Sequence, residues 1–190
     1  MTTTAIPNWT NKGVLPPVNS LQATSAERSP YRVKLLDVVM RFATSAERCN
    51  ILRGFLNYRA AVHSMALTQG FQWLDGSFSE DVELLEKRVP KDIDVVSFVH
   101  TPASFHHSPL DPDVLDHDHA KATYWVDSYF VEINLLPLDN LIKQSTYWYS
   151  MWSHRRTQEW KGYLEIDLSP VEDAAASAWL NAQMARGSAP

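Results

Sequence analysis

A short apolar segment with two aspartates at its start places the tightest constraint on the fold of this chain. Residues 93–99, IDVVSFV, are rich in β-branched and aromatic side chains, and this composition predicts a buried strand. Asp92 and Asp94 lie one residue apart where this strand begins. Alternate residues of a strand project from the same face, and an aspartate is costly to bury without a partner. We therefore expect both carboxylates on one side of a sheet, beside a group that compensates their charge.

Helix and strand patterns on either side of this strand predict an α+β domain. Apolar residues spaced three to four apart, and a proline at position 170, favour helices in four segments: 31–42, 45–67, 140–152 and from 170 onward. Apolar, aromatic or alternating residues favour strands in three further segments: 71–74, 123–136 and 162–168. Helices that precede and follow a small mixed sheet indicate the α+β class, with the sheet flanked by helices.

Local signals refine these boundaries. The pentapeptide TSAER occurs at 24–28 and at 44–48, and each copy fits a capping box, so each predicts a helix start. Gly70 is placed to end the second helix. The glutamate-rich residues 80–86 predict a short helix, and the proline-, aspartate- and histidine-rich residues 101–119 predict a surface loop.

The chain shows no obvious linker between domains. Residues 1–22 carry three prolines with little periodicity and are interpreted as an extended N-terminal arm. Residues 23–186 form the predicted domain, and residues 187–190 are expected to be disordered.

Composition excludes several classes of protein. Cys49 is the only cysteine, which excludes an internal disulfide framework and a cysteine-based zinc cluster. No apolar run approaches the roughly 18 residues of a membrane helix, and the first residues lack the pattern of a secretory signal, so we expect a cytoplasmic protein without membrane partners. A net charge of −5 argues against a surface that coats nucleic acid broadly, although it allows a local basic groove.

The residues around the paired aspartates suggest chemistry on phosphates. Mg²⁺ prefers hard oxygen ligands and completes its shell with water and substrate phosphates, so Asp92 and Asp94 suit this ion. Gly76 and Ser77 follow the strand at 71–74. A glycine lets the backbone approach a phosphate closely, and a serine hydroxyl can donate to it. We interpret this pair as a phosphate cradle beside a metal site.

These residues carry a resemblance. Gly-Ser, a spacer and Asp-hydrophobic-Asp, within WLDGSFSE and VPKDIDVVSF, resemble the signature of the polymerase-β type nucleotidyltransferase superfamily. Together with GVLPP near the N-terminus and EWKGYLEIDL near the C-terminus, the chain is similar to a family of small bacterial nucleotidyltransferase-like proteins of undefined function. The spacer from Ser77 to Asp92 is longer than in minimal antitoxin-type members. The resemblance implies a nucleotidyltransferase fold and two Mg²⁺ (or Mn²⁺) ions at the aspartates.

Members of this superfamily use a third carboxylate from a neighbouring strand. Asp127 and Glu132 have opposite parity in the segment 123–136, so only one can face the site. Asp127 lies in mid-strand among aromatic and β-branched residues, where an unpaired charge is hardest to tolerate, and we select it as the third catalytic and metal-binding residue. An ion pair between Asp127 and a core arginine is the alternative.

Basic and aromatic residues between 145 and 161 are the candidates for the rest of the nucleotide site. We assign Arg155, Arg156 and Lys161 to the triphosphate, because guanidinium and ammonium groups bind phosphate strongly. Trp148 and Trp152 share a helical face and could stack a base, but packing against the core is favoured. Four histidines suggest zinc, although a solvated loop is favoured over a zinc site: 106, 107, 117 and 119.

The expected activity is transfer of a nucleoside monophosphate from an NTP, such as ATP, or a dNTP to an acceptor hydroxyl, with release of pyrophosphate. The acceptor would be a protein, an RNA end or a growing oligonucleotide. The resemblance implies a role in prokaryotic antiphage defence or a toxin–antitoxin system, with a toxin or effector as a protein partner. The alternative is a catalytically silent module of the same fold that binds nucleotide or a partner. The presence of all three carboxylates favours the enzyme.

Overall fold

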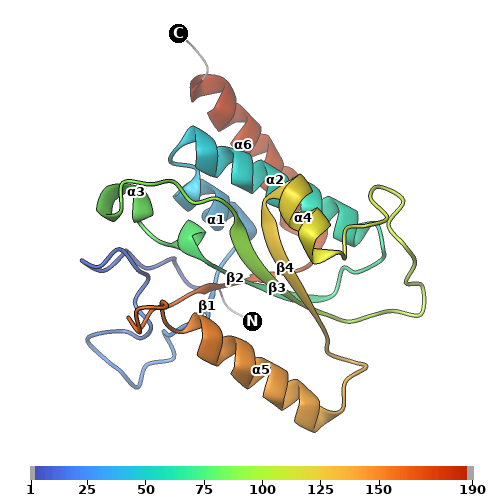
Figure 1. Ribbon diagram of the computed structural model, residues 1–190, viewed down its shortest axis with the longest axis horizontal. Coiled ribbons are helices and arrows are strands. Elements are labelled where there is room, and N and C mark those ends of the chain that lie inside the picture. Colours follow the sequence, from blue (N-terminus) through green and yellow to red (C-terminus); the bar gives the residue numbers. More distant parts are fainter. Residues whose placement is uncertain (1–2, 188–190) are drawn as a thin grey trace.

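A mixed sheet of five strands lies at the centre of the computed structural model, which describes residues 3–187 (Figure 1). The strands, in the spatial order β1-β5-β2-β3-β4, are β1 (Tyr31–Arg32), β5 (Leu164–Asp167), β2 (Gly70–Asp75), β3 (Ile93–Val99) and β4 (Val126–Glu132). β3 pairs in parallel with β4, whereas β2 runs antiparallel to both β3 and β5. β1 extends the sheet by a parallel pairing with β5.

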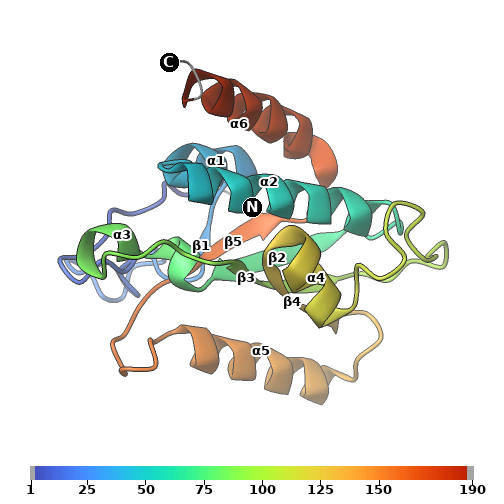
Figure 2. The same cartoon turned by 45° about the horizontal axis from the view of Figure 1, so that its top comes forward.

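Helices cover both faces of this sheet (Figure 2). One face carries α1 (Leu35–Phe42), α2 (Ala46–His63) and α6 (Asp173–Gly187), and the other carries α5 (Leu138–Trp152). α4 (His117–Tyr124) packs against β4 and α2. Shorter turns of helix complete the fold: η1 (Ser77–Ser79), α3 (Val82–Leu85) and η2 (Pro170–Glu172). Helices around a mixed sheet confirm the predicted α+β class.

The two faces of the sheet build separate apolar cores. Successive strand residues point to opposite faces, so Val95 of β3 joins the larger core with α1, α2 and α6, while Val96 joins the smaller one. Trp148 and Trp152 of α5 are buried in the smaller core. The preference for packing over an exposed role is therefore confirmed for both tryptophans.

The two TSAER copies behave differently. In the second copy the Ser45 hydroxyl accepts a hydrogen bond from the backbone N–H of Arg48 and caps α2, which confirms the predicted helix start. The prediction for the first copy is wrong, because residues 24–28 form turns and no helix follows them. Pro30 supplies no backbone N–H, so a helix that began at this copy would lose a hydrogen bond within its second turn.

Other boundaries also differ from expectation. Gly70 does not end a helix: α2 ends at His63, and Gly70 opens β2 with φ +131°, where an added Cβ would lie 2.0 Å from the Phe98 carbonyl oxygen. The last residues of the predicted loop 101–119 belong to α4, whose C-terminal turn at Trp125 then leads into β4. The short helix expected within 80–86 is present as α3.

The predicted N-terminal arm has no regular helix or strand over residues 3–22, yet Val14 and Leu15 are buried against the domain. The backbone of Leu15 pairs with Gly162, which precedes β5. The tail predicted to be disordered begins at Gly187, the last residue of α6, and its remaining residues 188–190 lie outside the described chain. Among residues 3–187, no helix combines the length and apolar character needed to cross a membrane.

Candidate functional site

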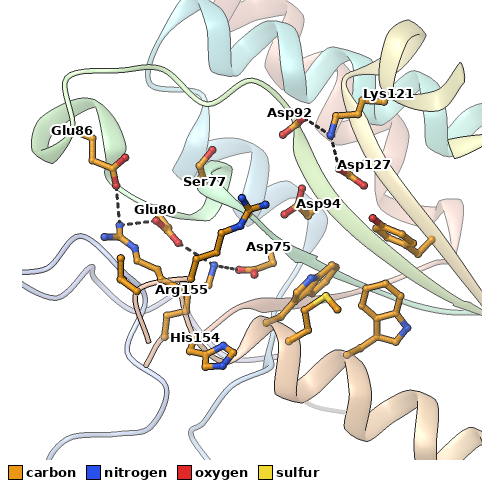
Figure 3. Close-up of a pocket in the computed structure, with 18 of the residues that line it drawn as sticks. Asp75, Ser77, Glu80, Glu86, Asp92, Asp94, Lys121, Asp127, His154 and Arg155 are labelled. Carbon is orange, nitrogen blue, oxygen red and sulfur yellow. Dashed lines mark hydrogen bonds and ion pairs between the residues drawn. The ribbon is translucent and has the colours of Figure 1, made fainter. Parts of the chain in front are cut away.

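Three aspartates form a row across neighbouring strands at one end of the sheet. Asp94 of β3 pairs with Asp75 of β2 on one side and with Asp127 of β4 on the other. Residues paired across strands project to the same face, so the three carboxylates point together into a cavity of about 590 Å³ (Figure 3). Asp92, which precedes β3, lines the same cavity. The structure thus brings together all three predicted carboxylates and adds Asp75 to them.

Asp94 is the aspartate of this row that has no cationic partner. Within residues 3–187 its carboxylate accepts no hydrogen bond and forms no ion pair, although it is partly buried. Burial, followed by repulsion from Asp75, Asp127 and Asp92, raises the pKa of Asp94 to about 7. A proton or a bound cation therefore stabilises this carboxylate near neutral pH.

Two lysines balance the other carboxylates. Lys121 of α4 places its Nζ 3.1 Å from Asp92 Oδ2 and 2.5 Å from Asp127 Oδ2 (Figure 3). The hydrogen bond to Asp127 is the main reason that the pKa of Lys121 is raised. The buried Lys161 Nζ lies 2.8 Å from Asp75 Oδ1 and 3.0 Å from Glu80 Oε1.

The choice of Asp127 over Glu132 agrees with the geometry. Asp127 lines the cavity, whereas Glu132 is exposed at the other end of β4 and accepts a hydrogen bond from the Thr101 hydroxyl. Asp127 pairs with Lys121, so the alternative of a core arginine as its partner is wrong. Its second oxygen, Oδ1, is buried and accepts no hydrogen bond from the described residues, and His117 Nδ1 lies 3.5 Å from it.

A tight turn after β2 places Gly76 and Ser77 against the row of aspartates. Gly76 has φ +81°, and a Cβ added there would lie 2.7 Å from Asp94 Oδ2. A side chain is therefore excluded by both the backbone conformation and the space. The Ser77 hydroxyl has no hydrogen-bond partner within residues 3–187, and Ser77 lines the cavity.

Arg48 holds the segment that follows this turn. Its buried guanidinium donates to the carbonyl oxygens of Phe78 and Glu80, both at 2.6 Å, and pairs with the Glu83 carboxylate. These bonds tie the turn to α2, so the position of Gly76 and Ser77 rests on the rigid helical layer.

The three predicted phosphate ligands line the cavity but differ in availability. Arg155 Nη2 lies 2.6 Å from Glu80 Oε2, and Lys161 is buried with Asp75. Arg156 is exposed and forms no ion pair within the described chain. Lys161 therefore serves to neutralise buried carboxylates, and Arg156 is the cation that remains free to bind a phosphate.

The comparisons with known proteins identify a family without naming an activity. Residues 7–167 match the model described as "Family of unknown function (DUF6932)". This chain belongs to the DUF6932 family. No curated protein and no solved structure matches the chain. Every cavity residue named above lies within the matched region.

In this DUF6932 member, the histidine-rich loop does not assemble a metal site. His106 and His107 are exposed, and His119 Nε2 contacts Asp111 at 2.7 Å. Within residues 3–187, no group of three or more His, Cys, Asp or Glu side chains is arranged to hold a metal ion. At the row of aspartates, the ammonium of Lys121 lies between Asp92 and Asp127 instead.

Sequence patterns predict neither Asp75 nor Lys121 of this DUF6932 site. Asp75 had a usable signal, because it directly precedes Gly76 and ends an apolar strand. Lys121 had none, since it lies on a helix after a long loop and only the packing of α4 against β4 brings it to Asp127.

Proposed function

We propose that this protein has a nucleotidyltransferase fold of the polymerase-β type and transfers a nucleoside monophosphate from an NTP or dNTP to an acceptor hydroxyl. One observation carries the proposal: Asp94 lies between two other aspartates, at the wall of a cavity, without a cationic partner. Acids gathered in this way are stable when a cation binds among them.

The donor set at the site fits a hard divalent ion. Asp92, Asp94 and Asp127 offer only carboxylate oxygens, which Mg²⁺ and Mn²⁺ prefer. Asp94 has both oxygens without a hydrogen bond and Asp127 has one, Oδ1, which His117 Nδ1 approaches only to 3.5 Å, so these oxygens can serve as ligands. A bound Mg²⁺ or Mn²⁺ would polarise the α-phosphate and neutralise charge on the pyrophosphate.

The turn at Gly76 and Ser77 supports a triphosphate next to these carboxylates. The Ser77 hydroxyl can donate to a phosphate oxygen, and the absence of a side chain at Gly76 leaves room for the Asp94 carboxylate beside the turn. Arg156 supplies a free guanidinium at the cavity wall. The cavity volume of about 590 Å³ is within the range of small-molecule sites.

Aromatic side chains give the cavity an apolar wall on the α5 side. Trp148, Trp152 and the half-exposed Tyr129 line it, and the rings of Tyr129 and Trp148 lie 4.7 Å apart. An aromatic side chain in the same cavity as the phosphate-binding turn suits a nucleobase, and in this proposal Tyr129 offers it. The two tryptophans hold this wall in place as core residues.

The reaction forms one bond and breaks one. The acceptor oxygen attacks the α-phosphorus, and the bond from that phosphorus to the oxygen bridging to the β-phosphate breaks. The acceptor proton passes to a neighbouring carboxylate or water, and pyrophosphate leaves. In this proposal Asp127 lies on the acceptor side and Ser77 on the side of the leaving group.

The acceptor is a protein, an RNA end or an oligonucleotide, and a partner or effector supplies part of its binding surface. The resemblance of the Gly-Ser and Asp-Ile-Asp motifs supports a setting in antiphage defence or a toxin–antitoxin system. The second candidate is a module that binds nucleotide without turnover. The ion pairs of Lys121 with Asp92 and Asp127 favour this candidate, because they engage two carboxylates that a metal ion would need.

Transfer can be tested directly. Purified protein is incubated with each α-³²P-labelled NTP and dNTP in Mg²⁺ or Mn²⁺, with and without total RNA, and pyrophosphate release and label transfer are measured. We expect release with the wild type, no release with Asp94→Asn, and unchanged release with Glu132→Gln, an exposed carboxylate on the same strand as Asp127. Nucleotide binding without pyrophosphate release under all conditions would instead identify the silent module.

A further inference from the structure

Lys121 occupies the position between two of the proposed metal ligands. Its Nζ contacts Oδ2 of Asp92 at 3.1 Å and Oδ2 of Asp127 at 2.5 Å. The side chain comes from α4, an ordered helix whose first turn is capped by the Asp116 carboxylate. The ammonium is therefore presented to the two carboxylates by the fold.

We propose that Lys121 takes the place of a second divalent ion, so that the site holds a single metal ion. This inference rests on the proposed function, and it alters the expectation of two ions that came from the resemblance. A second ion would place positive charge between Asp92 and Asp127. The ammonium group of Lys121 already places a compact positive charge there, with three hydrogen-bond donors.

The pairing of charges leaves room for one ion. Lys161 shares its charge between Asp75 and Glu80, and the single charge of Lys121 is shared by Asp92 and Asp127 through their Oδ2 atoms. Among the aspartates that line the cavity in the described chain, Asp94 has no such partner, and Asp127 Oδ1 has no hydrogen bond. The single ion would bind at Asp94 beside Asp127 Oδ1, which accepts no hydrogen bond and has His117 Nδ1 3.5 Å away.

Lys121 is then a positioning residue for the acceptor side of the reaction. It acts through Asp92 and Asp127, because its contacts hold both carboxylates at a fixed separation. It also supplies positive charge that a second metal ion would otherwise supply. Because the lysine is covalently attached, its charge is present at any metal concentration.

The number of bound ions tests this inference without measuring transfer. Mn²⁺ bound per chain is counted by equilibrium dialysis and electron paramagnetic resonance, in the presence of α,β-methylene-ATP. We expect one ion in the wild type and two in Lys121→Met, because Asp92 and Asp127 lose their shared counter-charge. Lys121→Arg should restore one ion, and Lys143→Met, an exposed lysine on α5, should leave one ion.

The outcomes separate this inference from the proposed function. Two ions in the wild type, or one ion in Lys121→Met with an unchanged melting curve, would overturn the inference and leave the nucleotidyltransferase proposal standing. No bound ion in the wild type, even with nucleotide, would overturn both. If Lys121→Met does not fold, Lys121→Gln removes the charge while keeping polar contacts, and the same count decides.

Discussion

Asp94 and Asp127 occupy paired positions on the parallel strands β3 and β4, and their carboxylates share one cavity. Asp75 pairs with Asp94 from the antiparallel side. Two different strand pairings thus align three acids at the same level of the sheet. Their mutual repulsion is retained in the folded protein. Binding of a cation or a proton among them relieves this repulsion and is therefore favourable.

The first prediction concerns stability and pH. The pKa of Asp94 is about 7 in the folded protein against an ordinary value of 3.8, so the native state holds an extra proton between these limits. The contribution of this group to the free energy of unfolding therefore falls by a few kcal/mol in total as the pH rises from about 4 to 7. Above pH 7 the contribution stays at its lower value. We expect Asp94→Asn to raise the melting temperature at pH 8 without metal and to change it little at pH 4.

Thermal melts of the wild type and Asp94→Asn at both pH values check this difference. Glu132→Gln is the matched control, because it lies on β4 outside the cavity. An equal effect of Asp94→Asn at pH 4 and pH 8 would mean that repulsion among the aspartates does not govern this carboxylate.

The second prediction compares the two candidates for the third carboxylate. Asp127→Asn should abolish transfer, because it removes the charge beside Asp94, whereas Glu132→Gln should retain it. The stability of Asp127→Asn should change by about 1 kcal/mol or less, since its lysine partner is 44% exposed and keeps Asp92. Single-turnover rates and thermal melts decide, and an inactive Glu132→Gln beside an active Asp127→Asn would reverse the assignment.

The third prediction concerns the turn after β2. Gly76→Val should prevent nucleotide binding and lower stability, because φ is +81° and an added Cβ would lie 2.7 Å from Asp94 Oδ2. Ser77→Ala should weaken nucleotide binding by roughly 1 kcal/mol, the value of one hydrogen bond, with no loss of stability. Titration calorimetry with an NTP analogue measures both, and an unchanged affinity in Gly76→Val would place the triphosphate elsewhere.

The fourth prediction separates two basic residues of the same cavity. Lys161→Met should lower the free energy of unfolding by about 3–5 kcal/mol, because it leaves Asp75 buried without a counter-charge, while Glu80 keeps only Arg155. Arg156→Met should leave stability unchanged and weaken nucleotide binding roughly tenfold, since this exposed guanidinium has no partner in the described chain to lose. Urea melts and calorimetry on both variants measure the contrast, and a destabilised Arg156→Met would contradict it.

Local patterns were sufficient to predict much of the scaffold. The β-branched run 93–99 forms β3 as predicted, and the apolar spacing within 45–67 and 140–152 forms α2 and α5. These elements are recognisable because a strand or helix buries one face with a period set by its own geometry. The Gly-Ser and Asp-Ile-Asp motifs were visible for the same reason, since each lies within a few residues.

The composition of the site depended on contacts between distant segments. Asp75 joins Asp94 only through the antiparallel register of β2 and β3, and Lys121 reaches Asp127 only because α4 packs beside β4. Neither register nor helix packing is encoded in a short sequence window, because both depend on burying the apolar faces of several elements at once. The sequence therefore specified which acids are present, and the tertiary structure decided which of them share a cavity and which cations accompany them.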